Sequence, residues 1–285
     1  MSIKRGRGRL DMDDLRSYGR PPFNVVVVHG GPGARGEMAR VARELSKRWG
    51  VLEPLQTATS LLGQVGELKA ALEKEGDLPA TLIGFFWGAW LCFIFAASYP
   101  AMVKKLILVG SGPFEERYAA RIAETRWSRL SLGERAEVES IVKILEGPES
   151  AGAEEKNAAM ARMGALFSKV DAYDPEACEP GAVELRADVF QVVWKEAADL
   201  RRTGKLLELG EVIECPVVAI HGEYDPHPAD GVEGPLLAVL DSFKFILLER
   251  CGHAPWTERW AKEKFYDILD EELESTLLEE ATSSQ

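Results

Sequence analysis

Four short stretches of the sequence contain the side chains that could do chemistry. Asp225 lies in HGEYDPHP and His253 in GHAPW, and each stretch directly follows a run of apolar residues. A carboxylate beside an imidazole can make it a general base that takes a proton from a nucleophile or from water. The stretch HGGPG, residues 29–33, is rich in glycine, whose backbone N–H groups can approach an anion closely. These residue types predict a site that moves a proton and stabilises a negatively charged oxygen.

The fourth stretch, GFFWG, has the outline of a glycine-x-nucleophile-x-glycine turn between a strand and a helix. Its central residue, Phe86, has no group that can attack a substrate. Cys92 lies six residues further on, about a turn and two-thirds along the predicted helix, and points elsewhere. Ser111 follows a neighbouring strand and borders the predicted pocket, but no glycine elbow presents it. We therefore predict a preserved turn without a nucleophile, in which the Phe86 ring fills the space that a substrate acyl group needs.

Alternating strands and helices must position these four stretches. From Phe23 onward, short β-branched runs alternate with helical patterns, which indicates an α/β fold with a mostly parallel, doubly wound sheet. The predicted strands are 25–28, 51–55, 80–83, 106–109, 217–220 and 245–248. The predicted helices are 38–48, 61–72, 87–99 and a long final helix from about residue 257. Because ligands of open α/β sheets bind beyond the carboxyl ends of the strands, the four stretches should converge there.

The sequence divides into a core with an insertion. Residues 113–210 have no strand pattern and are helical and charged, whereas strand and helix alternate again from residue 217. We predict a core of residues 23–112 and 211–285, a helical lid at 113–210 and a basic, polar N-terminal segment at 1–22. A lid shapes a substrate pocket, although a plain helical packing layer would give the same pattern. We expect the lid to bring Trp127 or Trp194 to a pocket that is also lined by Phe85, Phe86, Trp87 and His253.

Composition excludes several classes of partner. The chain has 285 residues, a net charge of -12 and a pI near 5.0, which disfavours binding to nucleic acid or to a membrane surface. A basic cluster near the N-terminus, Lys4, Arg5, Arg7 and Arg9, either tethers an anionic surface or is a solvated tail. The four cysteines are widely spaced and no apolar signal segment precedes them, so we expect a cytoplasmic setting. We expect no metal and no cofactor, and a small apolar or amphipathic molecule as the partner.

The order of the turn, the acid and the histidine along the chain resembles that of the α/β-hydrolase superfamily. Within it, HGGPG and the turn GFFWG resemble the proline-iminopeptidase-like branch, whose members carry HGGPG and a G-x-S-W-G elbow. The resemblance extends from about residue 23 to the final helix and implies the α/β-hydrolase fold. It also implies roles for five residues: Asp225 as the acid, His253 as the base, the amides of Gly31 and Trp87 as oxyanion donors, and Phe86 at the position of the serine nucleophile.

The resemblance leaves some positions open. Glu223 is an alternative to Asp225 as the acid, although Asp225 fits the motif position better. His29, Gly30, Phe85 and Ser111 are expected at the pocket, while His29, His221 and His227 are by default structural or supporting residues. Most members of the family have two antiparallel strands ahead of the HGGPG strand. Only about twenty residues stand there in this chain, so we expect the N-terminal edge strands to be missing.

Three functions are compatible with Phe86. The first, which we favour, is a catalytically impaired protein that binds a small molecule or a partner on a hydrolase scaffold. The second is an enzyme in which Asp225 and His253 act as a general base without a covalent intermediate. The third is an otherwise ordinary serine hydrolase, a peptidase or esterase, in which Phe86 is a variant. All three keep the acid, the base and the glycine-rich loop.

Overall fold

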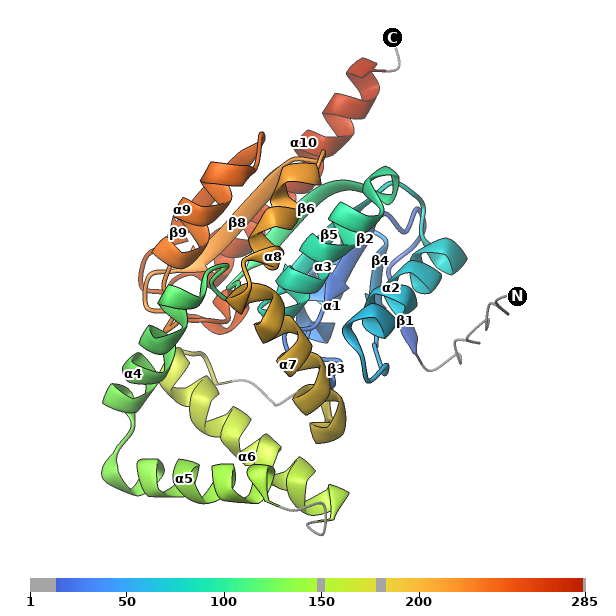
Figure 1. Ribbon diagram of the computed structural model, residues 1–285. Helices are drawn as coiled ribbons and strands as arrows, with labels where there is room; N and C mark the ends of the chain where they lie inside the picture. The colour runs from blue at the N-terminus through green and yellow to red at the C-terminus, as the bar shows by residue number, and fades with distance from the viewer. Residues whose placement is uncertain (1–13, 148–151, 178–182, 284–285) are drawn as a thin grey trace, which may run out of the picture.

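The computed structural model describes residues 14–147, 152–177 and 183–283. Its main sheet has seven strands in the order β1-β4-β2-β5-β6-β8-β9 (Figure 1). The strands are β1 Leu15–Tyr18, β2 Val25–Val28, β4 Val51–Pro54, β5 Ala80–Phe85, β6 Val103–Val109, β8 Val217–Gly222 and β9 Phe243–Leu248. All neighbouring strands pair in parallel except β1 and β4, which are antiparallel. The predicted mostly parallel α/β sheet is therefore confirmed.

Helices cover both faces of the sheet. The helices are α1 Ala39–Leu45, α2 Leu61–Glu75, α3 Trp87–Ser98, α9 Asp230–Val239 and α10 Lys262–Ser283, with short 3-10 turns at Pro100–Met102, Leu209–Val212 and Pro255–Thr257. In β2, Val26 and Val28 pack toward α2, α3 and α9, whereas Val25 and Val27 pack toward α1 and α10. Successive strand residues point to opposite faces, so a run of four valines supplies both hydrophobic layers.

The N-terminal edge of the sheet corrects one expectation. Strand β1 lies within the segment predicted to lack edge strands, and it pairs antiparallel with β4 from Leu15 opposite Pro54 to Tyr18 opposite Val51. The Tyr18 hydroxyl donates to the buried Glu53 carboxylate at 2.6 Å. One short edge strand is therefore present. The basic cluster at residues 4–9 lies outside the described residues.

Residues between β6 and β8 form a mainly helical segment. It contains the turn Glu116–Tyr118 and helices α4 Ala119–Arg129, α5 Leu132–Glu146, α6 Ala153–Asp171, α7 Ala187–Arg202 and α8 Lys205–Glu208. Apolar residues of α5 and α6 share a small hydrophobic cluster with Leu130, which directly follows α4. Figure 1 shows α5 and α6 at the opposite end of the molecule from the end of α10. A two-stranded ladder, β3 Ala34–Arg35 with β7 Glu184–Leu185, joins this segment to the loop that follows β2.

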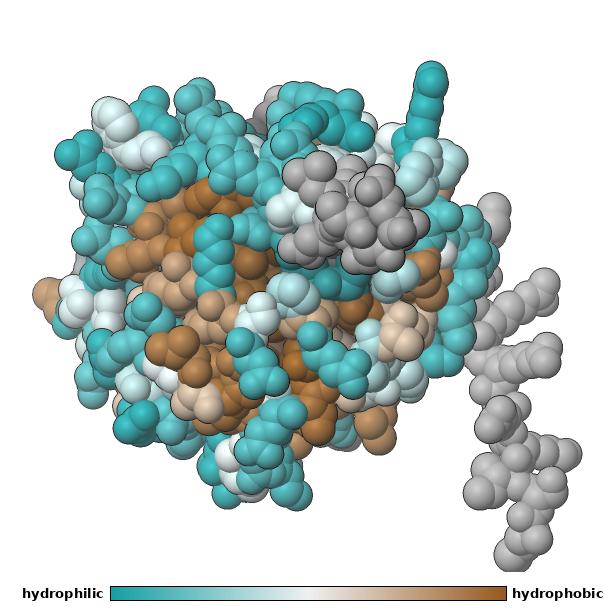
Figure 2. Space-filling model, turned by 90° about the horizontal axis from the view of Figure 1, so that it is seen from above, coloured by the Kyte–Doolittle hydropathy of each residue, from teal (hydrophilic) through white to brown (hydrophobic). Residues whose placement is uncertain are grey.

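One face of the molecule combines hydrophobic and hydrophilic side chains. Figure 2 views the molecule from above and shows a hydrophobic area bounded by hydrophilic side chains. Exposed apolar side chains are normal on folded proteins, because polar atoms cannot cover the whole surface. Among the described residues, no helix combines the length and the apolar composition that crossing a membrane requires.

Candidate functional site

The turn between β5 and α3 is tight and strained at Phe86. The backbone of Phe86 has a φ of 45° and a ψ of -104°, a conformation that residues other than glycine rarely adopt. The Phe86 N–H donates to the Val109 carbonyl at 3.0 Å. A Cβ atom on Gly84 would lie 2.3 Å from the Gly88 carbonyl oxygen, and one on Gly88 would lie 2.4 Å from that of Val28. Two glycines thus allow the close backbone approach that holds residue 86 at the end of β5.

The Phe86 ring contacts both histidines of the site. Its centroid lies 5.2 Å from that of His253, nearly edge-on, and 4.7 Å from that of His227. On the other side it lies 5.3 Å from the ring of Trp194 in α7. The ring therefore lies between the two imidazoles and Trp194.

Asp225 and His253 are hydrogen bonded, as the sequence predicted. His253 Nδ1 lies 2.7 Å from Asp225 Oδ2, and the Asp225 side chain is fully buried. Burial by itself disfavours both charges, yet mutual attraction lowers the pKa of Asp225 well below its usual range and raises the pKa of His253 above 6.5. Loops after β8 and β9 bring these residues together from 28 positions apart. The alternative acid, Glu223, is exposed.

His227 is the site residue whose position the sequence did not predict. Its Nδ1 lies 2.6 Å from Asp225 Oδ1, and its backbone N–H donates to the same oxygen at 2.9 Å. The Asp-x-His spacing is the signal, because an aspartate commonly accepts a hydrogen bond from the N–H two residues on. Burial lowers the pKa of His227 to about 3, so it is neutral near pH 7. Behind it, His221 Nε2 lies 2.7 Å from the His227 carbonyl oxygen.

These side chains also form the group best suited to a metal. Among the described residues, Asp225, His227 and His253 have potential ligand atoms within 4.8 Å of one another. Both carboxylate oxygens, however, lie within 2.7 Å of an imidazole Nδ1. Ligands around a tetrahedral zinc ion are about 3.3 Å apart, so a shared metal would need all three side chains to move. The distances are those of a hydrogen-bonded His-Asp-His arrangement.

The glycine-rich loop after β2 makes its own internal hydrogen bonds. The Gly30 N–H donates to Glu37 Oε2 at 2.8 Å. The Trp87 N–H donates to the Gly30 carbonyl at 2.9 Å. Of the two amides predicted as oxyanion donors, that of Trp87 therefore has an internal acceptor, and that of Gly31 follows directly after an amide bonded to Glu37. Burial raises the pKa of Glu37, which also lies within the field of His253.

The remaining predicted pocket residues lie behind the pocket wall. Phe85 packs against His253 and Trp256, at 4.7 and 4.6 Å between ring centroids. His29 is buried, and its Nδ1 lies 2.7 Å from the Gly31 carbonyl oxygen. Gly30 lies against the Phe85 ring, and the buried Ser111 hydroxyl donates to the neighbouring Gly112 carbonyl. These side chains support the site rather than line the cavity.

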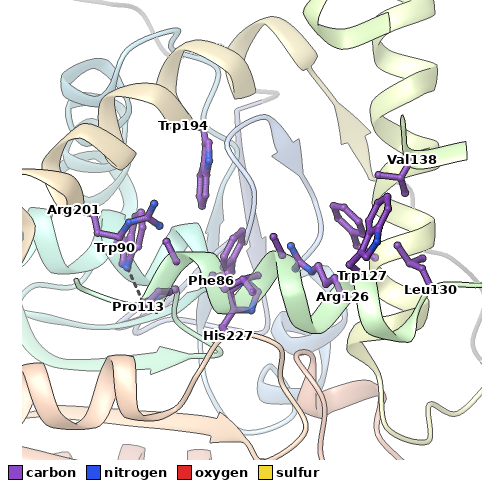
Figure 3. Close-up of a pocket in the computed structure, with 15 residues that line it drawn as sticks. Phe86, Trp90, Pro113, Arg126, Trp127, Leu130, Val138, Trp194, Arg201 and His227 are labelled. Carbon is purple, nitrogen blue, oxygen red and sulfur yellow. Dashed lines mark hydrogen bonds between the residues drawn. The ribbon is translucent and has the colours of Figure 1, made fainter. Parts of the chain in front are cut away.

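A cavity of about 350 Å³ lies between Phe86 and the helical segment (Figure 3). Trp127 and Trp194 line it, as expected, and so do Phe86 and His227. Phe85, Trp87 and His253 were expected in the lining but are absent from it. Trp87 is fully buried in the core under the sheet. His227 therefore takes the position at the cavity that the sequence assigned to His253.

Comparisons with known proteins agree on the fold. No protein-family model matches the chain. It is 27% identical over 274 residues to the pimeloyl-[acyl-carrier protein] methyl ester esterase of Chromobacterium violaceum, and the match covers 92% of this chain and 98% of the esterase.

Two solved structures are similar over most of their length. The crystal structure of VinJ has a TM-score of 0.66 at 20% identity and covers 92% of this chain and 94% of its own. MGS-MChE2, an alpha/beta hydrolase enzyme from the metagenome of sediments from the lagoon of Mar Chica, has a TM-score of 0.55 at 15% identity and covers 92% and 94%. These likenesses concern the fold, and the chain has the α/β-hydrolase fold.

Proposed function

We propose that this protein binds a small apolar or amphipathic molecule on a hydrolase scaffold and forms no covalent intermediate with it. The observation that carries the proposal is Phe86, which occupies the strained end of β5 where the family pattern has a serine. The phenyl ring contacts His253 where the hydroxyl of a nucleophile would donate its proton to this base. The protein is thus proposed to be a catalytically impaired relative of serine hydrolases.

Neighbouring residues do not replace the serine. Cys92 lies fully buried inside α3, and burial raises the pKa of its thiol, which keeps it unreactive. The Ser111 hydroxyl is buried and donates to the Gly112 carbonyl. Among the described residues, neither the Cys92 thiol nor the Ser111 hydroxyl forms a hydrogen bond with His253. The absence of a presented oxygen or sulfur supports binding over acyl transfer.

The ancestry of the site supports an ester or amide as the original substrate. HGGPG, GFFWG and the Asp225–His253 pair keep the pattern of the proline-iminopeptidase-like branch, and we propose this branch as the origin. Similarity to a protein named as a methyl ester esterase is consistent with such ancestry. We assign Asp225 and His253 as the inherited acid and base, and Phe86 as the substituted nucleophile position.

A second function is favoured by one specific observation. His227 is neutral, shares Asp225 with His253 and lines the cavity, so it can accept a proton or a hydrogen bond from a bound molecule. An enzyme built in this way would use general-base chemistry without an acyl intermediate. For either function, we propose a small-molecule partner and a cytoplasmic location, the latter because the four cysteines are widely spaced along the sequence and form no C-x-x-C pair.

The decisive experiment is reversion of Phe86. Phe86→Ser places a hydroxyl next to His253, and we expect it to hydrolyse 4-nitrophenyl acetate faster than the wild-type chain does. The wild type should show no pre-steady-state burst, because it has no nucleophile to acylate. Stopped-flow absorbance measures both quantities.

The control is the double variant Phe86→Ser/His253→Ala, which should lose the gain because the new serine has no base. A burst in the wild type would contradict the proposed function. Steady turnover of the wild type without a burst, abolished by Asp225→Asn, would support general-base chemistry instead.

A further inference from the structure

Aromatic side chains form the walls of the cavity. Trp194 stands nearly parallel to Trp90, with ring centroids 5.6 Å apart and an interplanar angle of 8°. It is also parallel to Phe190, at 5.8 Å and 7°. Phe86 faces Trp194 from the sheet side. Parallel and tilted rings favour a flat aromatic guest, which can stack on one wall and meet the other at its edge.

The two arginines in the lining carry no uncompensated charge. Arg126 makes a bidentate pair with the buried Asp171, with Nε 2.9 Å from Oδ1 and Nη2 2.5 Å from Oδ2. Arg201 donates to Glu116 at 2.8 Å and also lies over the Trp90 ring. Figure 3 shows Arg201 and Arg126 on opposite sides of Phe86. Because each guanidinium already has a carboxylate partner, the cavity does not select an anionic guest.

His227 supplies a hydrogen-bond acceptor among these apolar walls. The ionised Asp225 holds the proton on His227 Nδ1, at 2.6 Å, and the neutral ring then has its lone pair on Nε2. Among the described residues, no hydrogen bond reaches this nitrogen. Figure 3 shows His227 beside Phe86 in the lining of the cavity, between Arg201 and Arg126. A guest that stacks on Phe86 therefore brings its edge close to an acceptor that needs a donor.

We infer that the cavity binds an uncharged aromatic alcohol, whose ring packs against the Phe86 and Trp194 side chains that line the cavity and whose hydroxyl donates to His227 Nε2. The inference rests on the proposed ligand-binding function and adds its chemical class. The ring of such a ligand matches the aromatic side chains of the lining, and its hydroxyl matches the acceptor on His227. Its lack of charge matches the two arginines, each of which is already paired with a carboxylate.

Three probes of one shape test the inference on the wild-type protein. Isothermal titration calorimetry at pH 7 compares 2-naphthol with 2-methoxynaphthalene, which lacks the donor, and with 2-naphthoate, which adds a negative charge. A neutral hydrogen bond is worth about 0.5–1.5 kcal/mol, so 2-naphthol should bind roughly 2- to 10-fold more tightly than its methyl ether. The naphthoate should bind more weakly than the naphthol.

The matched variant is His227→Phe, which keeps a ring but removes the acceptor and should make naphthol and its methyl ether bind equally. The comparison of the three probes uses the wild-type protein, so it tests the inference even if His227→Phe does not fold. Equal binding of naphthol and methyl ether to the wild type would overturn the aromatic-alcohol inference but leave the ligand-binding function intact. Tighter binding of 2-naphthoate than of 2-naphthol would overturn the inference and would indicate an anionic ligand instead. Failure of all three probes to bind would overturn the inference and count against the ligand-binding function as well.

Discussion

At the scale of single residues, the proposed loss of hydrolysis involves the loop after β2 as well as Phe86. The Glu37 carboxylate accepts a hydrogen bond from the Gly30 amide, and the Trp87 amide donates to the Gly30 carbonyl oxygen. An oxyanion hole works only when its donors are free to meet the charge that develops on the substrate. We propose that the Glu37 carboxylate competes with a substrate oxygen for the amides of this loop.

This arrangement predicts that Phe86→Ser alone regains little activity. Glu37→Ala should free the Gly30 amide and remove a negative charge beside that of Gly31, so Phe86→Ser/Glu37→Ala should hydrolyse 4-nitrophenyl acetate faster than Phe86→Ser. One oxyanion donor is worth about 10²–10³ in kcat, and we expect at least a tenfold gain. The kcat of both variants is measured under saturating ester. Glu37→Ala by itself should remain inactive, and equal rates for the two serine variants would show that the carboxylate does not block the hole.

Some of the site could be predicted from residue types and some could not. Asp225 and His253 each follow a strand, and parallel strands end at one edge of the sheet, so their contact follows from the pattern alone. His227 and His253 each contact a different carboxylate oxygen of Asp225, and the Phe86 ring packs against His253. Such choices are made by packing between distant segments, which spacing along the chain does not encode.

At the scale of elements, the turn between β5 and α3 is the most demanding part of the fold. Gly84 and Gly88 let backbone atoms of β2, β5 and α3 approach without a Cβ between them. The substitution Gly88→Ala would place a Cβ 2.4 Å from the Val28 carbonyl oxygen, which must move. We expect a loss of roughly 2–4 kcal/mol in the free energy of unfolding, as for other overpacked or strained sites.

Gly66 offers a matched control. It lies inside helix α2, and no atom lies within 4 Å of the position that an added Cβ would take. Gly66→Ala should therefore stabilise the protein by about 0.5–1 kcal/mol through helix propensity. Urea denaturation followed by far-UV circular dichroism measures both variants. Similar effects of the two substitutions would mean that the β5–α3 turn tolerates a side chain and that its glycines are not required.

The elements that the sequence missed are short and rely on distant partners. Strand β1 has four residues with an exposed middle, and it is held by pairing with β4 and by the packing of Leu15 and Tyr18 against the core. Strand β3 has two residues and pairs with β7, about 150 positions away. By contrast, β2, β5 and β8 are buried along their whole length and are recognisable as continuous apolar runs. Hydrophobic patterning thus predicts the centre of the sheet better than its edges.

At the scale of the whole molecule, all four histidines lie in loops or strand ends near the site, and burial or a charged neighbour shifts the pKa of three of them. Burial lowers the pKa of His29 to about 4 and that of His227 to about 3, whereas Asp225 raises the pKa of His253 above 6.5. In the unfolded chain each imidazole titrates near pH 6.5. The folded protein therefore binds fewer protons than the unfolded chain at His29 and His227, and more at His253.

The sign of each contribution follows from proton linkage. Between pH 6.5 and about 3, unfolding lets His227 bind a proton, so its contribution to the free energy of unfolding falls as the pH falls. Above pH 6.5, unfolding releases the proton of His253, so its contribution is full below pH 6.5 and is lost as the pH rises through the raised pKa. The stabilising effect of the two histidines together is therefore greatest near pH 6.5.

Urea unfolding between pH 4.5 and 8 tests this balance. We expect the stability difference between wild type and His227→Phe to change by about 1.4 kcal/mol per pH unit below pH 6.5, because the variant has no imidazole to protonate on unfolding. The stability difference between wild type and His253→Phe should not vary with pH below pH 6.5. Above pH 6.5 this difference should change, because only the wild type loses the stabilising contribution of His253. A difference for His227→Phe that does not vary between pH 4.5 and 6.5 would mean that this imidazole is charged in the folded protein, and that its Nε2 is a donor to the cavity instead of an acceptor.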